Sequence, residues 1–466
     1  MQSLNKLSAI GKMIILESLI LFVPLLLLVF YPSECSVSFN FLLPGIVSIL
    51  IGLMIGIIGP KKLSSSRLVV FSWFYGFLLA AIPFYLLGGL TVVQALFESV
   101  SGFTTTGLSV LDVEKLPKIF LFYRAFLQYV GGLGFVFMMI LFVEEKDSAT
   151  LYQAEGHPDK LMPTIGKTAK TIVLIYLFFL LAGTIMYLLA GMDLLDALVH
   201  TMCALSTGGF SNRLASIASY DSFAIELVTI ILMMVGITNF ALLLSLIKGK
   251  IKIYLNSSET RFLFGILLVA IIGISFFLRS GGFELIYSLR LALFNAVSAV
   301  STTGFATCDY ALWPDEAVVI MILLMMIGGG IGSTAGGIKL GRICRLLKNL
   351  MHQIKKMLIP DRTVTLTYYS NGRERELLSR EDVEEASTYA SVYLLIFVLG
   401  SIALTYFANT NYLFGAFEFA SSIGTAGFSI GITNINTSSI CLLIEIAGMI
   451  LGRLEIFVLL KIFIKS

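Results

Sequence analysis

The sequence predicts an all-α polytopic membrane protein, and three observations support this fold class. Of the 466 residues, 57% are hydrophobic and 13% are charged, whereas soluble domains are about 25% charged. Apolar stretches near the ~20 residues that span a bilayer follow one another along the chain. The alternating ten-residue segments of a transmembrane barrel are not evident in the sequence. This composition excludes a disordered chain, a coiled coil and nearly every soluble fold.

The residues that carry most catalytic chemistry are scattered. The five cysteines form no C-x-x-C pair and the three histidines lie far apart, so neither a structural zinc site nor a disulfide framework is expected. No nucleophile–base pair or metal cluster stands out, and we expect a protein that is not an enzyme. The formal net charge is only +3, and no nucleic-acid partner is expected.

Ten stretches are expected to cross the membrane. The first two form an N-terminal helix pair over 1–62, and the spacing of Gly52 and Gly56 indicates close helix packing there. The first stretch is expected to be retained, because no small-residue cleavage site follows it. The ten stretches lie at about 13–31, 41–59, 67–88, 119–143, 170–190, 223–247, 262–279, 316–327 running on past Gly337, 386–407 and 440–463.

Lys and Arg are distributed unevenly between the connections. One set of loops is rich in them and includes ten between Lys339 and Arg380. The positive-inside rule places this set in the cytoplasm, and an even number of spans places both termini there. The opposite set holds only Lys115, Lys118, Arg213, Arg279 and Arg290, with Arg124 near a helix end.

Four further apolar stretches, at 92–104, 194–206, 287–301 and 411–424, are too short to cross. Each lies between two spans on the side that is poor in Lys and Arg. We expect short helices that enter the membrane partway and return as extended backbone. Such backbone is tolerated at membrane depth only where it is buried in protein or lines a water-filled path.

These short stretches end in a repeated motif, T-x-G-[FL]-[SA]. Its glycines are Gly107, Gly209, Gly304 and Gly427, which are 102, 95 and 123 residues apart. Four unrelated helix C-caps ending in Gly are the alternative. The repeat instead predicts four pore units around one axis, at 63–165, 166–258, 259–349 and 383–466, with a cytoplasmic segment at 350–382.

The motif suits a monovalent cation that loses its water. Backbone carbonyls supply oxygens without placing a charge in the membrane, and Gly adopts the unusual backbone angles that aim them. Thr adds a hydroxyl, and the C-terminus of a short helix adds negative partial charge. The predicted filter residues are Thr105, Thr106 and Gly107; Thr207, Gly208 and Gly209; Thr302, Thr303 and Gly304; and Thr425, Ala426 and Gly427.

A glycine-rich run interrupts the eighth span. Each Gly costs about 1 kcal/mol in a helix relative to Ala, so six of them between 328 and 337 cannot sustain one. We interpret this run as a gate facing the cavity below the filter; a passive kink for close packing is the alternative. The predicted gate residues are Gly328, Gly329, Gly330, Gly332, Ser333, Thr334, Gly336, Gly337 and Arg453.

Arg453 joins that set because it lies within the last span, where a charge is a functional hypothesis by default. At ~10 Å from a cation and an effective dielectric of ~20, it raises the energy of the ion by about 1.7 kcal/mol. It therefore slows conduction without forbidding it. Pairing with carboxylates of another unit is the alternative role.

The polar segment 350–382 contains an alternating run with Asn371–Gly372, a hairpin-turn signal. We expect a small β-hairpin at about 363–378, with an unstructured linker as the alternative.

The four loops resemble the filter loops of the TrkH/KtrB superfamily of potassium transporters. LYQAEGHPDKLMPTIGKTAKT (151–171), GGGIGSTAGGIK (328–339) and GRLE (452–455) are similar to further motifs of that family. The N-terminal helix pair resembles the TrkH branch. One departure is Leu108, which stands where the other loops have Phe, and its side chain is expected to point away from the ion path.

The resemblance implies potassium uptake across the cytoplasmic membrane of a bacterium or archaeon, with K⁺ as the transported ion. It also implies that the chain forms a homodimer, contacts membrane lipids and binds a cytoplasmic nucleotide-binding regulatory ring (TrkA-like). A nucleotide is expected to act only through that partner. The alternative is a secondary transporter of K⁺ or another monovalent cation, coupled to Na⁺ or H⁺ as a symporter. That class favours inverted repeats and charged midplane sites, whereas these units repeat in parallel.

Overall fold

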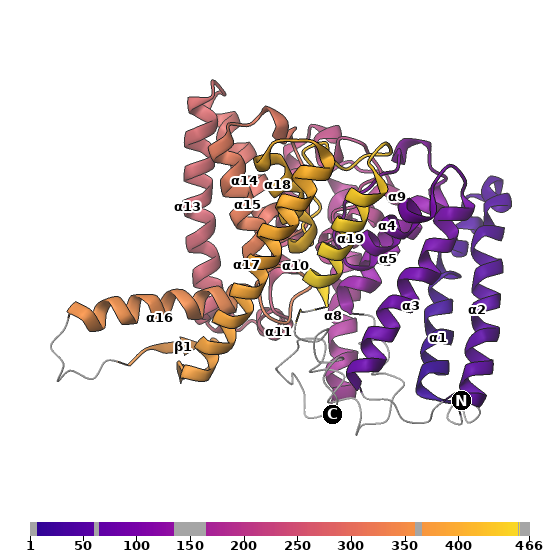
Figure 1. Cartoon of the computed structure of the whole chain (residues 1–466), viewed down its shortest axis with the longest axis horizontal. Helices are drawn as coiled ribbons and strands as arrows, with labels where there is room; N and C mark the ends of the chain where they lie inside the picture. The colour runs from indigo at the N-terminus through magenta and orange to yellow at the C-terminus, as the bar shows by residue number, and fades with distance from the viewer. Residues whose placement is uncertain (1–6, 60–64, 135–164, 359–365, 455, 457–466) are drawn as a thin grey trace.

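The structure is a computed structural model that describes residues 7–59, 65–134, 165–358, 366–454 and 456 (Figure 1). Within these residues the chain is a bundle of helices with one two-stranded hairpin. The predicted all-α polytopic fold is confirmed.

The N-terminal helix pair packs through glycines. A Cβ atom at Gly11 would overlap backbone atoms of Gly52 and Gly56, so the two helices approach as closely as backbones allow. Glu17 lies in the buried face of this pair and accepts a hydrogen bond from Ser72 (2.8 Å). The elements are α1 (Ala9–Ile20), η2 (Val23–Val29), η3 (Pro32–Ser38) and α2 (Phe39–Ile58).

Four units follow, each made of a long helix, a short apolar helix and a third helix of 13 to 16 described residues. The short helices begin and end within two residues of the predicted stretches. Their elements are α3 (Ser65–Leu86), α4 (Val92–Phe103) and α5 (Lys118–Leu133); α8 (Ile165–Leu189), α9 (Leu194–Leu205) and α10 (Phe223–Ile237); α13 (Ser258–Ser280), α14 (Leu285–Val300) and α15 (Asp315–Ile327); and α17 (Arg380–Ala408), α18 (Tyr412–Gly424) and α19 (Ser439–Arg453).

Six helical segments of the described chain are long and apolar enough to cross a membrane, and they match six of the ten predicted spans. A seventh is the pair α10 and α11 (Phe240–Ile247), which is bent by 118°. The other three predicted spans correspond to α5, α15 and α19, with 16, 13 and 15 described residues. The predicted stretches of α5 and α19 extend into residues outside the described part.

The predicted span at 223–247 is not one continuous helix. Asn239 accepts a hydrogen bond from the Ala241 N–H (2.7 Å), which starts a new helix, and its side-chain amide donates to the Ile331 carbonyl. The Ile237 carbonyl accepts a hydrogen bond from the Gly330 N–H (3.1 Å) rather than from its own helix. The break is therefore stabilised by the glycine-rich run of the next unit.

The helix of the eighth predicted span ends at Ile327, just before the glycine-rich run that was predicted to interrupt it. After the glycine-rich run the chain resumes as α16 (Leu340–Leu358), which extends sideways from the bundle (Figure 1). Its outer half exposes apolar side chains, such as Met357 and Leu358.

A β-hairpin lies where the sequence predicts one, with β1 (Tyr368–Ser370) paired antiparallel to β2 (Arg375–Leu377). Gly372, in the turn, has a φ of 93°. The hairpin contacts the start of α13, because the Ser370 N–H and the Lys348 ammonium both donate to the Ser258 hydroxyl (2.9 Å each). The predicted residues 363–365 lie outside the described part.

Two hydrophobic clusters form the core. One joins the N-terminal helices to the first unit and includes Leu442, Ile446 and Met449 of α19. The other extends through the second, third and fourth units. Because α19 packs against α4, the last unit meets the first and the four units close on themselves.

Candidate functional site

All four short helices end in the same turn. In each turn, a Thr that follows the helix adopts a left-handed backbone conformation, with φ between 50° and 55°. The N–H that follows it bonds back five residues, as from Thr106 to Ser101 (2.9 Å) and from Ala426 to Ser421 (2.8 Å). This is the Schellman arrangement, which usually takes Gly at the left-handed position. The four threonines are Thr105, Thr207, Thr302 and Thr425.

The motif glycines lie two residues further on and have a different role. Their φ values are 96°, 73°, 84° and 82°, a region that side chains other than Gly rarely adopt. A Cβ atom on each would overlap a backbone carbonyl oxygen of another unit's loop. These pairs are Gly107 with Gly208, Gly209 with Thr303, Gly304 with Ala426, and Gly427 with Thr106.

The pairs follow chain order and return to the start, so the four loops form a closed ring. The four glycines also line a single cavity of about 500 Å³. The same cavity is lined by the segments that follow each glycine, on the side predicted to be poor in Lys and Arg. Residues of all four loops therefore border one space.

A buried polar side chain braces each loop from nine residues before its glycine. The Glu98 carboxylate accepts hydrogen bonds from the Ser109 hydroxyl and the Val110 N–H (2.7 Å each). The Glu418 carboxylate does the same for Ser429 (2.6 Å) and Ile430 (2.9 Å). The equivalent contacts of the other two units are His200 to Ser211 (3.0 Å) and Asn295 to Thr307 (2.9 Å).

Sequence reasoning missed this bracing role. The repeat alignment did contain its signal, since a polar residue recurs at a position that faces inward in every unit. All four side chains are fully buried, and buried polar groups are retained where they are hydrogen-bonded.

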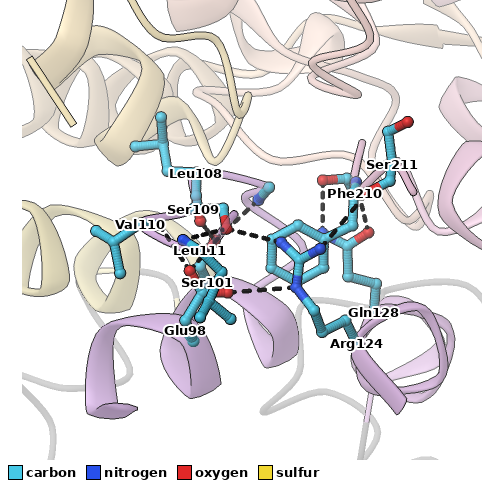
Figure 2. Close-up of polar contacts among 12 residues, drawn as sticks. Glu98, Ser101, Leu108, Ser109, Val110, Leu111, Arg124, Gln128, Phe210 and Ser211 are labelled. Carbon is cyan, nitrogen blue, oxygen red and sulfur yellow. Dashed lines mark hydrogen bonds and ion pairs between the residues drawn. The ribbon is translucent and has the colours of Figure 1, made fainter. Parts of the chain in front are cut away.

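Glu98 also pairs with a buried arginine. The Arg124 Nε atom lies 3.4 Å from Glu98 Oε2, and its Nη2 donates to the Ser109 hydroxyl (2.8 Å) (Figure 2). The guanidinium lies 4.0 Å from the centre of the Phe210 ring, in the second unit. Arg124 thus links two adjacent loops while its charge is offset by Glu98.

Arg213 is a second cation at the cavity and is similarly offset. It donates to the Asp196 carboxylate (2.9 Å), which also accepts a hydrogen bond from Tyr220 (2.6 Å). Contacts with Tyr220 and Asp196 raise the pKa of Arg213 above its usual value. Asp196 therefore offsets the positive charge of Arg213 at the cavity.

The glycine-rich run lies against the threonines of the ring. The Gly336 N–H donates to the Thr302 hydroxyl (2.8 Å), and the hydroxyls of Thr207 and Thr334 are 3.3 Å apart. A Cβ atom on Gly336 would overlap the Thr425 hydroxyl. Arg453 reaches the remaining threonine, with Nη1 3.4 Å from Thr105 Oγ1.

Both ends of the run are tied to α15. The N–H groups of Ile338 and Lys339 donate to the carbonyls of Met326 and Ile327 (2.9 Å each). Between them the chain turns back through three glycines with positive φ. These are Gly328 (70°), Gly332 (73°) and Gly337 (72°).

The other predicted gate residues contact several units. The Thr334 hydroxyl lies 3.0 Å from the carbonyls of both Leu205 and Gly236. The Ser333 hydroxyl bonds within the run, to the Gly330 carbonyl (2.7 Å). A Cβ atom on Gly329 would overlap Ala335, so the run is tightly folded on itself.

Arg453 lies between the run and the first unit. Its guanidinium donates to the Thr334 carbonyl (2.7 Å) and to the carbonyls of Gly131 and Gly132, and it faces the Trp73 ring. These partners place the positive charge of Arg453 beside the threonine face of the ring.

Leu108, the departure from the motif, is buried in the core of the first unit with 1% of its surface exposed. The corresponding Phe210, Phe305 and Phe428 are equally buried. Leu108 therefore packs as they do.

A family model decides what class of protein this geometry belongs to. The TrkH model, described as a cation transport protein, matches residues 86–466. The chain belongs to the TrkH family of cation transport proteins. The resemblance stated from the sequence motifs is therefore confirmed, and the chain is a multi-pass membrane protein.

Individual relatives extend the match to nearly the whole chain. An uncharacterized cation transporter of Methanocaldococcus jannaschii is 31% identical over 97% of this chain and 94% of its own. The Trk system potassium uptake protein TrkH of Escherichia coli is 32% identical over 86% of this chain and 85% of its own. The crystal structure of the potassium transporter TrkH from Vibrio parahaemolyticus superposes with a TM-score of 0.85 at 27% identity, covering 100% of this chain and 99% of that one.

Proposed function

We propose that this member of the TrkH family takes up K⁺ across the cytoplasmic membrane through a filter built by a single chain. The observation that carries the proposal is the closed ring, in which each motif glycine lies against a carbonyl of another unit. A ring of backbone carbonyls replaces the hydration shell of a cation. Two of the relatives are named as potassium transporters.

The filter would comprise the twelve predicted residues from Thr105 to Gly427. The cavity beyond the glycines serves as the outer entrance, and the four threonine hydroxyls face the inner end. Because the carbonyls carry only partial charges, they bind a monovalent ion strongly enough to dehydrate it and weakly enough to release it.

The run at 328–337 and Arg453 would form the gate. They contact all four ring threonines, so they occupy the position through which an ion leaves the ring. Withdrawal of the run exchanges a few hydrogen bonds without unwinding a helix.

The partners belong to the same proposal. We expect a homodimer and a cytoplasmic nucleotide-binding ring that acts on the hairpin and α16. Tyr369 of the hairpin donates to the buried carboxylate of Glu259 (3.2 Å), and a Cβ atom on Gly330 would lie 3.2 Å from Glu259 Oε2. This chain of contacts gives a cytoplasmic partner a route to the run. Both termini would face the cytoplasm, with the Lys- and Arg-rich loops.

The test is ⁸⁶Rb⁺ uptake into liposomes that contain the purified protein, with K⁺ and Na⁺ as competitors. K⁺ should compete far better than Na⁺. Absence of uptake, or equal competition by both ions, would overturn the proposal. Repeating the assay with imposed Na⁺ or H⁺ gradients separates a channel-like path from a coupled symporter. Only a symporter accumulates Rb⁺ against the electrochemical gradient of Rb⁺.

A further inference from the structure

Gln128 of α5 makes two hydrogen bonds to the backbone of the second loop. Its Nε2 donates to the Gly208 carbonyl (2.6 Å), and its Oε1 accepts from the Phe210 N–H (3.0 Å) (Figure 2). The side chain is fully buried. A carbonyl only accepts and an N–H only donates, so the orientation of the amide is fixed by its partners.

Gly208 is the exception among the four loops. The residues equivalent to it are Thr106, Thr303 and Ala426. The Thr106 hydroxyl bonds the Thr104 hydroxyl, and the Thr303 hydroxyl bonds that of Ser301 (2.7 Å each). Thus the first and third loops carry an internal hydroxyl pair that the second loop lacks.

The amide of Gln128 occupies the space of the missing side chain. A Cβ atom on Gly208 would overlap the Gln128 side-chain amide. Two consecutive glycines, Gly208 and Gly209, also make this loop the one with the greatest backbone freedom. A loop of this kind keeps one conformation only if other groups hold it.

The carbonyl that Gln128 holds is part of the ring. The Gly208 oxygen is the one that a Cβ atom on Gly107 would overlap. The equivalent carbonyls of Thr106, Thr303 and Ala426 accept no hydrogen bond from any residue that the structure describes. Gln128 therefore acts on one ring carbonyl of the four.

We propose that Gln128 is a positioning residue for ion selectivity, which holds the Gly208 carbonyl in the ring in place of the hydroxyl pair used by the first and third loops. The inference rests on the proposed function of the ring as a K⁺ filter. Without the amide, the Gly208–Gly209 segment rotates more freely and the ring adapts to the smaller Na⁺ ion.

Gln128→Leu tests this directly, because Leu is of similar size but makes no hydrogen bond. The K⁺/Na⁺ competition ratio in ⁸⁶Rb⁺ uptake should fall about tenfold, which corresponds to ~1.4 kcal/mol and to the loss of one or two buried hydrogen bonds. Gly208→Ala should lower the ratio by the same factor, because the added methyl group displaces the Gln128 amide. The backbone conformation of residue 208 is one that Ala can adopt, so strain does not explain the effect. A matched control is Ser18→Ala, which removes a buried hydrogen bond to the Ser48 hydroxyl (2.6 Å) in the N-terminal helix pair, outside the four loops, and should leave the ratio unchanged.

Rescue separates positioning from mere stability. The double variant Gln128→Ala with Gly208→Thr gives the second loop the hydroxyl pair of the first and third, since Ser206 stands where they have Thr104 and Ser301. It should recover most of the ratio that Gln128→Ala alone loses. An unchanged ratio in folded Gln128→Leu and Gly208→Ala, or no recovery in the double variant, would overturn the inference. A wild-type protein without K⁺ preference would instead overturn the proposed function.

Discussion

The ring and the glycine-rich run beneath it are both non-helical backbone at the centre of a membrane protein, yet they are held in different ways. Each ring loop is fixed chiefly by its own unit, through the turn that ends its short helix and the buried residue nine positions before its glycine. In the second loop, Gln128 of the first unit adds two further hydrogen bonds. The run at 328–337 depends largely on groups from other units, including Ile237, Leu205 and Arg453.

Under the proposed function, this difference would allow one chain both to select an ion and to open. Hydrogen bonds between residues close in sequence hold each ring loop, so breaking them disrupts the fold of the whole unit. Bonds to other units join preformed surfaces and can be exchanged when one surface shifts. We therefore assign selection to the ring and movement to the run, and each of the following experiments probes one side of that division.

The largest effect is expected from Gly304→Ser. Ser would have to adopt a φ of 84° and its Cβ would overlap the Ala426 carbonyl. Strain of about 3 kcal/mol should distort the ring and lower the K⁺/Na⁺ competition ratio about a hundredfold. Gly265→Ser is the matched control, because nothing lies within 4 Å of a Cβ atom there. An unchanged ratio in folded Gly304→Ser would contradict the filter assignment.

Arg453→Ala should raise the initial rate of ⁸⁶Rb⁺ uptake about tenfold to twentyfold at equal protein content. The reason is the removal of about 1.7 kcal/mol of repulsion, for an ion ~10 Å away at a dielectric of ~20. The K⁺/Na⁺ ratio should stay the same, since the ring is intact. Arg453→Lys keeps the charge and should change the rate far less; an equal rise in both variants would mean that shape, and not charge, limits flux.

Thr334→Val should release the run from its neighbours. The variant loses the hydrogen bonds to the Leu205 and Gly236 carbonyls. Because this loss weakens the attachment of the run by about 1 kcal/mol, we expect the uptake rate to rise about fivefold. Thr184→Val, whose hydroxyl bonds only its own helix at Leu180, serves as the control. A slower rate in a well-folded Thr334→Val protein would show that the run is a structural support.

Tyr369→Phe is expected to have the smallest effect, a rise in basal uptake of about twofold. It removes one hydrogen bond to Glu259 (3.2 Å), worth about 0.5 kcal/mol, and so weakens the contact of that carboxylate with the run. Tyr368→Phe is a neighbouring control, because that side chain is 48% exposed. Identical uptake rates in both variants would show that the contact between the hairpin and Glu259 does not affect gating.

Much of the site followed from local patterns. The T-x-G motif and the length of the apolar stretches predicted four short helices, because a helix end and a left-handed turn are decided by a few neighbouring residues. From the sequence, unusual backbone angles are predicted at the motif glycines, with no such prediction for the threonines. Thr105 and its three counterparts also adopt positive φ, which propensity does not favour and which accompanies hydrogen bonds from the next residue back to the same short helix.

Long-range partners could not be predicted in the same way. Arg453 lies 348 residues from Thr105 in sequence, and Gln128 lies 80 residues from the carbonyl it holds. The bend at Thr238 depends on the run of the following unit. Nothing near these residues in the sequence reveals such partners, because the packing of whole units brings them together.

The sequence by itself determined the membrane fold, the fourfold repeat and the positions of ring and run, since hydrophobic length and glycine placement act locally. Only the tertiary structure decided which carbonyl meets which glycine, how Glu98 and Glu418 brace the loops, and where Arg453 places its charge. The physical reason is that a buried polar group must find its partners within a few ångströms in space, and distance along the chain does not limit which groups those are.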